Sequence, residues 1–124
     1  MPIFVIQEHH ASHIHWDFRL QMNGVLKSWA IPKQPPRTKN IKRLAIQVED
    51  HLSSYADFEG EIKEGYGKGI VKIWDKGTYT LDEKTPEKIV VHLHGKILNG
   101  KYVLIKTKIG EEKSKNKNWL LFKI

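Results

Sequence analysis

The chain of 124 residues contains no cysteine. Disulfide bonds, thiolate metal sites and cysteine nucleophiles are therefore excluded, and the composition fits a reducing compartment. Long apolar runs are missing too, since no stretch approaches the roughly 18 residues that a membrane-spanning helix needs. The first residues, MPIFVIQEHH, lack the basic segment and the long apolar core of a signal peptide. We expect a cytoplasmic protein with no membrane association.

Acidic residues are scarce beside basic ones: 14 Asp and Glu stand against 21 Lys and Arg, a net charge of +7. This balance favours a polyanionic partner, nucleic acid above all, because Lys and Arg contacts with phosphates release counterions. A hydrophobic content of 40% with 10% aromatic residues indicates a folded chain. The length predicts one domain, residues 1–124, with one core.

Alternating segments separated by turn residues predict a mainly β fold. Asn23 and Gly24 lie between two alternating runs, residues 16–22 and 25–31, and form the strongest short signal for a hairpin. A second hairpin is predicted to turn at Asn99 and Gly100. The other expected strands are residues 4–7, 43–50, 70–75, 77–82, 89–97, 101–109 and 119–124. Loops are expected at 31–40, 65–69 and 110–118, with one short helical turn within 51–62, which favours a small barrel or sandwich.

The segment QEHHASHIHWDFRL, residues 7–20, holds four of the seven histidines of the chain. Successive side chains of a strand point to opposite faces, so alternate residues of this segment would share a face. The polar face would carry His15, Asp17 and Arg19. The apolar face would carry Trp16, Phe18 and Leu20 and pack in the core.

His9, His15 and Asp17 together could supply two imidazoles and one carboxylate to a divalent ion. Nitrogen and oxygen donors without thiolate suit Mn²⁺, Fe²⁺, Co²⁺ or Zn²⁺, and the bend between His9 and His15 would let the strands converge. The alternative is a surface histidine cluster with ordinary hydrogen bonds. His10 and His13 are expected to be exposed and outside the site.

Arginines next to such a site point to an oxyanion substrate, because the planar guanidinium matches phosphate bidentately. Arg19 extends the polar face of residues 15–19. In residues 43–51, Arg43, Glu49 and His51 are predicted to share a polar face opposite the apolar residues 44, 46 and 48. A metal, two arginines and a histidine suit phosphoryl transfer, with His51 as proton or hydrogen-bond donor. The alternatives are a solvated face and a salt bridge from Arg19 to Asp17 or Glu49.

The glycine-rich segment GYGKG, residues 65–69, lacks the full pattern of a phosphate-binding P-loop. We interpret it as an ordinary turn.

In order along the chain, QEHHASHIHWDFRL, LKSWAIPK, KRLAIQVEDH, YADFEG, GYGKG with VKIWD, and WLLFK closely resemble the 3′-phosphoesterase domain of bacterial DNA ligase D. The resemblance covers nearly the whole sequence, and the chain looks like a stand-alone version. It implies a mainly β fold: a small closed or partly closed β-barrel of about eight strands with little helix.

The resemblance also implies a manganese-dependent phosphoesterase that heals DNA 3′ ends in non-homologous end joining; Co²⁺ or Zn²⁺ could replace Mn²⁺. Such an enzyme removes a 3′-phosphate, and in many members a 3′-ribonucleoside, from a primer–template. It leaves a 3′-OH for a polymerase and a ligase, which would be separate proteins here. The implied metal ligands are His9, His15 and Asp17. The implied phosphate contacts are Arg19, Arg43 and His51, and the implied supporting residues are Gln7, Glu49 and Tyr55.

Family members usually have more sequence before the FVIQ strand, so any activity that relies on that segment, such as ribonucleoside removal, is left open. Two other functions also remain open. Two histidines and one carboxylate are the ligands of a non-haem Fe(II) oxygenase, although such enzymes need no paired arginines. A non-catalytic nucleic-acid-binding barrel would account for the charge of +7 but would leave the His/Asp cluster unexplained.

Overall fold

The computed structural model describes residues 2–65, 67–108 and 117–124. Nine strands within these residues form one antiparallel sheet in the order β1-β2-β3-β4-β9-β8-β7-β6-β5. The strands are β1 (Ile3–His10), β2 (Ile14–Met22), β3 (Val25–Ile31), β4 (Lys42–Leu52), β5 (Gly60–Ile62), β6 (Gly69–Lys84), β7 (Lys88–His94), β8 (Asn99–Lys106) and β9 (Asn118–Lys123). A short 3₁₀ helix, η1 (Ser53–Asp57), lies between β4 and β5.

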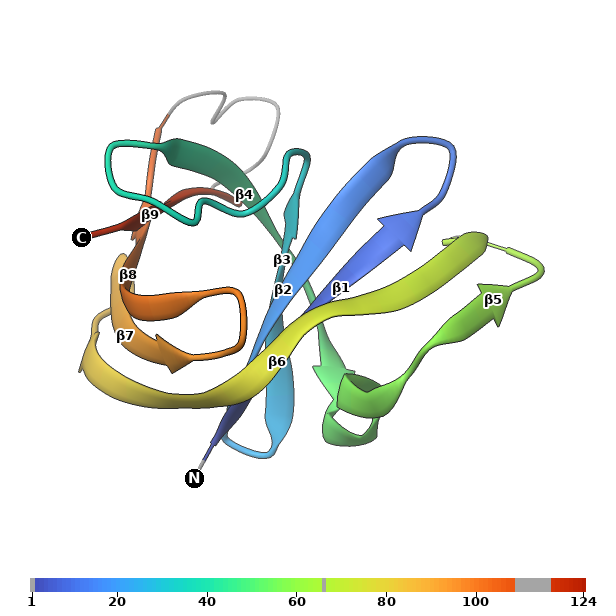
Figure 1. Cartoon of the computed structure of the whole chain (residues 1–124), viewed down its shortest axis with the longest axis horizontal. Helices are drawn as coiled ribbons and strands as arrows, with labels where there is room; N and C mark the ends of the chain where they lie inside the picture. Colours follow the sequence, from blue (N-terminus) through green and yellow to red (C-terminus); the bar gives the residue numbers. More distant parts are fainter. Residues whose placement is uncertain (1, 66, 109–116) are drawn as a thin grey trace.

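β1 pairs with β6 as well as with β2, and this second pairing closes eight of the strands into a barrel. The predicted mainly β barrel of about eight strands with little helix is confirmed. β5 lies outside the closed ring and pairs with the first residues of β6, which curves away from the barrel toward it (Figure 1). In the described parts of the chain, no helix is long and apolar enough to cross a membrane.

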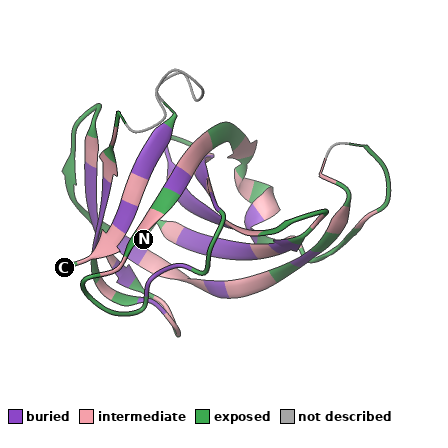
Figure 2. Ribbon diagram, turned by 90° about the horizontal axis from the view of Figure 1, so that it is seen from above, coloured by how far each residue is buried: buried purple, intermediate pink, exposed green. Residues whose placement is uncertain are grey.

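The main core fills the barrel, because its buried side chains come from all eight strands of the ring. Phe18 and Leu20 are fully buried there, and Trp16 packs against the same cluster. The predicted apolar face of residues 16–20 is therefore confirmed. Figure 2 shows the resulting bands of buried residues along the strands.

A smaller apolar cluster lies on the outer face of the barrel. Val5 and Leu26 are fully buried, although they alternate along their strands with the residues of the main core. Ala56 of η1 covers them, and Tyr55 packs against the same cluster. The predicted helical turn is thus confirmed, and it shelters part of the outer face of β1 and β3.

The first predicted hairpin is confirmed by positive φ angles at Asn23 (54°) and Gly24 (83°). The second predicted turn is wrong, because Asn99 and Gly100 already belong to β8 and pair with the end of β7. The chain turns instead at residues 95–98. A buried carboxylate, Asp75, fixes that turn by accepting hydrogen bonds from the backbone N–H groups of residues 96 and 98.

The two strands predicted at 70–75 and 77–82 are one continuous strand, β6. Gly77 does not interrupt it. A Cβ atom at Gly77 would lie 2.1 Å from the carbonyl oxygen of His94, so glycine there permits the close approach of the neighbouring chain. Most of the polar connection predicted at 110–118 lies outside the described residues.

The proline-containing loop that follows β3 is tied to the barrel. The hydroxyl of Tyr102 donates a hydrogen bond of 2.7 Å to the Pro36 carbonyl, and the Arg37 guanidinium lies over the Trp74 ring. Burial, aided by the charge of Asp75, raises the pKa of Tyr102 to about 12, so this hydroxyl keeps its proton for the bond.

Candidate active site

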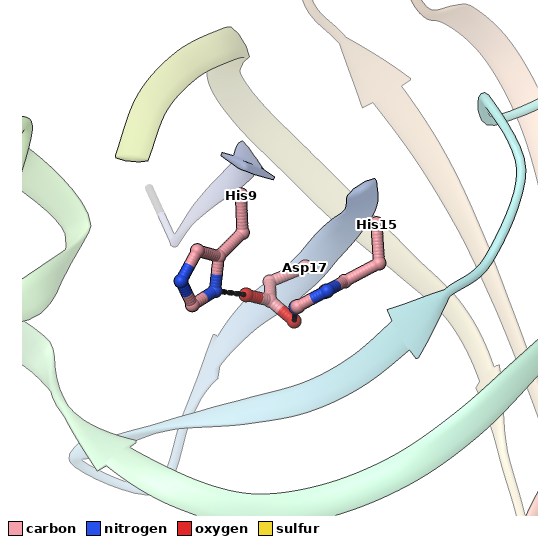
Figure 3. A group of neighbouring side chains, drawn as sticks. All are labelled: His9, His15 and Asp17. Carbon is pink, nitrogen blue, oxygen red and sulfur yellow. Dashed lines mark ion pairs between the residues drawn. The ribbon is translucent and has the colours of Figure 1, made fainter. Parts of the chain in front are cut away.

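The register of the β1–β2 hairpin brings the predicted metal ligands together. His9 pairs with His15, and Gln7 pairs with Asp17. Residues directly opposite each other in an antiparallel pair project to the same face, so these side chains meet on the outer face of the barrel. In Figure 3, His9, His15 and Asp17 point toward one another. The bend after β1 therefore does bring the two strands together, as predicted.

The donor atoms of this group lie close enough together to converge on one metal ion. His9 Nδ1 lies 3.7 Å from Asp17 Oδ2, and His15 Nε2 lies 3.3 Å from Asp17 Oδ1. All three potential ligand atoms lie within 4.8 Å of one another. Ligands bound at about 2.1 Å from one ion are separated by about 3.0–3.5 Å. Some of the observed separations are somewhat wider than that, so a small inward shift of the side chains would complete the site, and two imidazoles and a carboxylate suit a divalent ion such as Mn²⁺, Co²⁺ or Zn²⁺.

Asp17 is the only carboxylate of this trio, and its surroundings keep it ionised. Burial acts to raise its pKa, but the hydrogen bond with His15 and the charge of Arg19 outweigh burial, so the pKa lies below its ordinary value. The hydrogen bond to Asp17 in turn raises the pKa of His15. An ionised carboxylate is the form that binds metal.

Arg19 lies behind the ligands and is only 3% exposed. Its Nε donates to Gln7 Oε1 at 2.6 Å, its Nη1 donates to Ser28 Oγ at 2.8 Å, and its Nη2 lies 3.4 Å from Asp17 Oδ2. Desolvation lowers the pKa of Arg19 while Asp17 opposes that effect, and a guanidinium stays charged in proteins. The site therefore contains a fixed positive charge held by protein partners.

Gln7 joins Arg19 to the segment that covers the outer face. Its amide nitrogen donates to the carbonyl oxygens of Tyr55 (2.9 Å) and Phe58 (3.2 Å), and its amide oxygen accepts from Arg19. The Arg19 guanidinium also lies over the Tyr55 ring, 5.0 Å from its centroid. The predicted supporting residues Gln7 and Tyr55 are thus both in direct contact with Arg19.

His51 joins the site through an irregularity in β4. Leu26 pairs with His51 and Ser28 with Val48, so β4 has one extra residue between these two pairs. This bulge turns His51 toward Arg19, whose Nη1 lies 3.1 Å from His51 Nδ1. The His51 ring also packs against the Tyr55 ring at a centroid distance of 5.0 Å.

The predicted common face of Arg43, Glu49 and His51 is wrong. Ala45 is fully buried in the main core, so alternation places Arg43 on the core side of β4, and the bulge then moves His51 to the outer side. Arg43 Nε donates to the Gln34 carbonyl at 2.8 Å. Glu49 is exposed, and among the described residues its carboxylate does not contact the cluster. The apolar side chains of Leu44 and Val48 are each 37% exposed instead of facing the core.

His10 and His13 are exposed, as predicted. His10 Nε2 lies 2.6 Å from Glu8 Oε2, so its partner is outside the cluster.

Two groups that contact the site residues do not belong to any motif recognised in the sequence. Ser28 accepts from Arg19, and it could have been found by counting outward from the hairpin turn, which fixes Ser28 opposite Arg19. The other is the backbone carbonyl of Gly67, which lies 2.7 Å from His9 Nε2. A backbone oxygen contributed by a segment distant in the sequence gives no side-chain signal. The predicted turn at 65–69 is therefore also a neighbour of the site; Tyr66 lies outside the described residues.

Comparison with known families shows which family the chain belongs to. The family model of the DNA ligase D 3′-phosphoesterase domain matches residues 7–106, which include the hairpin, His51 and the glycine-rich segment. This chain belongs to that family. The resemblance of its motifs to the DNA ligase D 3′-phosphoesterase domain is thereby confirmed.

The relatives of this chain include long multifunctional proteins. The non-homologous end joining DNA repair protein LigD of Mycobacterium tuberculosis is 50% identical over 109 residues, 84% of this chain and 14% of that protein. LigD of Pseudomonas aeruginosa is 45% identical over 126 residues, 97% of this chain and 15% of that protein. LigD of Mycolicibacterium smegmatis is 44% identical over 129 residues, 94% of this chain and 16% of that protein. The chain thus spans 14 to 16% of the length of these relatives.

Membership of a phosphoesterase family removes the support for the oxygenase alternative, although the ligand types would suit it.

Proposed function

We propose that this member of the 3′-phosphoesterase family is a manganese-dependent enzyme that removes a terminal 3′-phosphate from DNA and leaves a 3′-OH. The observation that carries the proposal is the cluster of His9, His15 and Asp17 within the matched region, with the buried charge of Arg19 behind it. The net charge of +7 favours a polyanionic substrate.

His9, His15 and Asp17 would hold the divalent ion. When bound, such an ion polarises a phosphate oxygen and lowers the pKa of a coordinated water. Arg19 contributes its charge to stabilise the negative transition state, and it orients Asp17 and His51. Because its named donors already have protein partners, its role is to organise the site from behind.

His51 supplies the proton or hydrogen bond in this proposal. His51 Nδ1 lies 3.1 Å from Arg19 Nη1, which can only donate, and 3.1 Å from the Glu49 carbonyl oxygen, which can only accept, so each neutral tautomer has a partner at Nδ1. In the tautomer that accepts from Arg19 the hydrogen is on Nε2, and that Nε2–H group would donate to a phosphate oxygen or to the leaving oxygen. The resemblance implies roles for Arg43 and Glu49 at the substrate. These roles remain predictions, because neither side chain contacts His9, His15 or Asp17 in the described part of the chain.

The test is a primer–template ending in a 3′-phosphate, incubated with the chain and Mn²⁺, Co²⁺ or Zn²⁺. We expect conversion to a 3′-OH end. His15→Ala should lower the single-turnover rate by more than about 100-fold, since even residues that merely orient metal ligands contribute 10–100-fold. His13→Ala is the matched control, because His13 is exposed in the same segment, and it should keep the wild-type rate.

Failure to form a 3′-OH with any of the three metals would refute the proposed reaction. Tight, salt-sensitive DNA binding without turnover would support the non-catalytic barrel instead. Equal rates for wild type and His15→Ala would remove His15 from the proposed metal site.

We further propose that the enzyme also acts on ends that carry a 3′-terminal ribonucleoside. The same single-turnover assay on such an end tests this directly. A 3′-OH is the end that a polymerase extends and a ligase seals, so these two activities would use the product in end joining.

A further inference from the structure

The glycine-rich segment of residues 65–69 meets the candidate metal ligands through one backbone atom. The carbonyl oxygen of Gly67 lies 2.7 Å from His9 Nε2, while His9 Nδ1 faces Asp17 Oδ2 at 3.7 Å. A carbonyl oxygen can only accept a hydrogen bond, so Nε2 must carry the hydrogen. In the neutral ring this leaves the lone pair on Nδ1, the atom that faces Asp17.

We propose that the Gly67 carbonyl is a positioning group that locks His9 in its Nε2–H tautomer and so presents Nδ1 as a metal ligand. The inference rests on the proposed metal-dependent function and extends it to a backbone atom of the glycine-rich segment. Histidines that bind metal commonly donate their second ring N–H to a carboxylate or a backbone carbonyl, which fixes both tautomer and ring orientation.

The distance on the other side of the ring agrees with this assignment. A separation of 3.7 Å between His9 Nδ1 and Asp17 Oδ2 is too long for a hydrogen bond between them. In the neutral Nε2–H ring, His9 Nδ1 and Asp17 Oδ2 therefore face each other with no hydrogen between them. Two lone-pair donors that face each other at this distance are suited to share a cation.

Backbone contacts of the described residues of this segment hold the Gly67 carbonyl in place. Gly65 and Gly67 have φ angles of +83° and +87°, and the Lys68 N–H donates to the Gly65 carbonyl at 3.3 Å. Gly69 is pressed against β1, since a Cβ atom there would lie 2.2 Å from the His10 carbonyl oxygen. Gly69, two residues after Gly67, is thus packed against the strand that carries His9.

Gly65 and Gly67 form a matched pair for substitution. Their φ angles are nearly equal, so alanine introduces similar backbone strain at either position. A Cβ atom at Gly67 would lie 3.7 Å from His9 Cε1, an ordinary contact, whereas no atom of the described residues lies within 4 Å of one at Gly65. Asparagine tolerates positive φ better than alanine does, so Gly67→Asn should preserve the backbone geometry.

The decisive measurement is ¹⁵N NMR of the His9 ring in the metal-free protein, at a mildly alkaline pH where imidazoles are ordinarily neutral. We expect the Nε2–H tautomer in wild type, Gly65→Ala and Gly67→Asn. In Gly67→Ala we expect a mixture of both tautomers. Calorimetry should then show that Mn²⁺ affinity falls by about 10–100-fold in Gly67→Ala, the usual cost of losing an orienting partner, but not in the other two variants.

An Nδ1–H tautomer in the wild-type protein would overturn the proposal, and this holds even if Gly67→Ala does not fold. So would a folded Gly67→Ala that keeps both the tautomer and the wild-type Mn²⁺ affinity. The proposed reaction fails separately: a protein that shows the expected tautomer and binds Mn²⁺ but leaves 3′-phosphate ends intact contradicts the reaction and supports the positioning role.

Discussion

Asp17 and Arg19 are opposite charges that the fold keeps almost out of solvent, with exposed fractions of 7% and 3%. Burying either charge alone would cost several kcal/mol, and their contacts offset part of that cost. Asp17 also accepts from His15 and faces His9. Removing the charge of Asp17 therefore changes the stability of the metal-free protein in a pH-dependent way.

We predict that Asp17→Asn, in the presence of a chelator, lowers the free energy of unfolding by about 1–3 kcal/mol, the usual worth of hydrogen bonds to charged groups. The loss should be largest between about pH 4 and pH 6.5, the ordinary pKa values of the carboxyl and the imidazole. Urea unfolding of wild type and variant across this range measures it.

The signs follow from the two pKa shifts. The pKa of Asp17 is lowered in the folded state, so its contribution is fully present above the ordinary carboxyl pKa and disappears as pH falls through the lowered one. The pKa of His15 is raised, so its contribution is fully present below the ordinary imidazole pKa and disappears as pH rises through the raised one. A difference between wild type and Asp17→Asn that does not vary with pH would contradict this account.

At the scale of strands, the sequence predicts the β1–β2 hairpin better than it predicts β4, although both carry residues of the candidate site. The β1–β2 hairpin follows from strict alternation, which separates Asp17 from Phe18, and the two-residue turn after β2 fixes the pairing with β3. β4 misleads because its core residue is the small Ala45, while the larger Leu44 and Val48 are partly exposed. Its bulge lies where no glycine or proline marks it.

Contacts between segments that are distant in the sequence cannot be predicted from local patterns, for a different reason. Gly67 reaches His9 because the start of β6 pairs with the end of β1, and that pairing depends on closure of the whole barrel. The turn at residues 95–98 likewise depends on Asp75, which lies on another strand. Local turn propensity at Asn99 and Gly100 is overridden by the hydrogen bonds that this carboxylate accepts.

Asp75 is therefore predicted to be a stability determinant remote from the site. It is 4% exposed and accepts from the backbone N–H groups of Lys76, Lys96 and Leu98 at 2.8–2.9 Å. Asp75→Asn turns an amide NH₂ toward these donors, so we expect a loss of about 2–4 kcal/mol in the free energy of unfolding. Chemical denaturation measures the loss.

Asp82→Asn is the control on the same strand. Asp82 makes a surface ion pair with Lys101 at 3.4 Å, and such pairs contribute about 0–1 kcal/mol. Comparable losses in the two variants would show that the carboxylate of Asp75 does not hold the turn.

For the whole molecule, the position of the site on the outer face of the barrel links the site to the stability of the fold. The interior is filled by the main core, so the site uses the reverse side of strands whose other face is fully packed. β1 carries His9 and also closes the ring through β6. Loss of β1 would open the barrel, and we therefore expect cooperative unfolding in which the proposed metal site disappears together with the fold.

Mn²⁺ is accordingly predicted to stabilise the entire chain. A ligand that binds only the folded state at 100 times its Kd adds about 2.7 kcal/mol, which corresponds to a rise in Tm of about 10 °C for a domain of this size. Thermal unfolding with increasing Mn²⁺ should show this rise in wild type and in His13→Ala. His15→Ala should lose most of it, because one of the three ligands is missing. If wild type and His15→Ala rise equally with Mn²⁺, the ion binds elsewhere on the chain and the assignment of the cluster as its site is wrong.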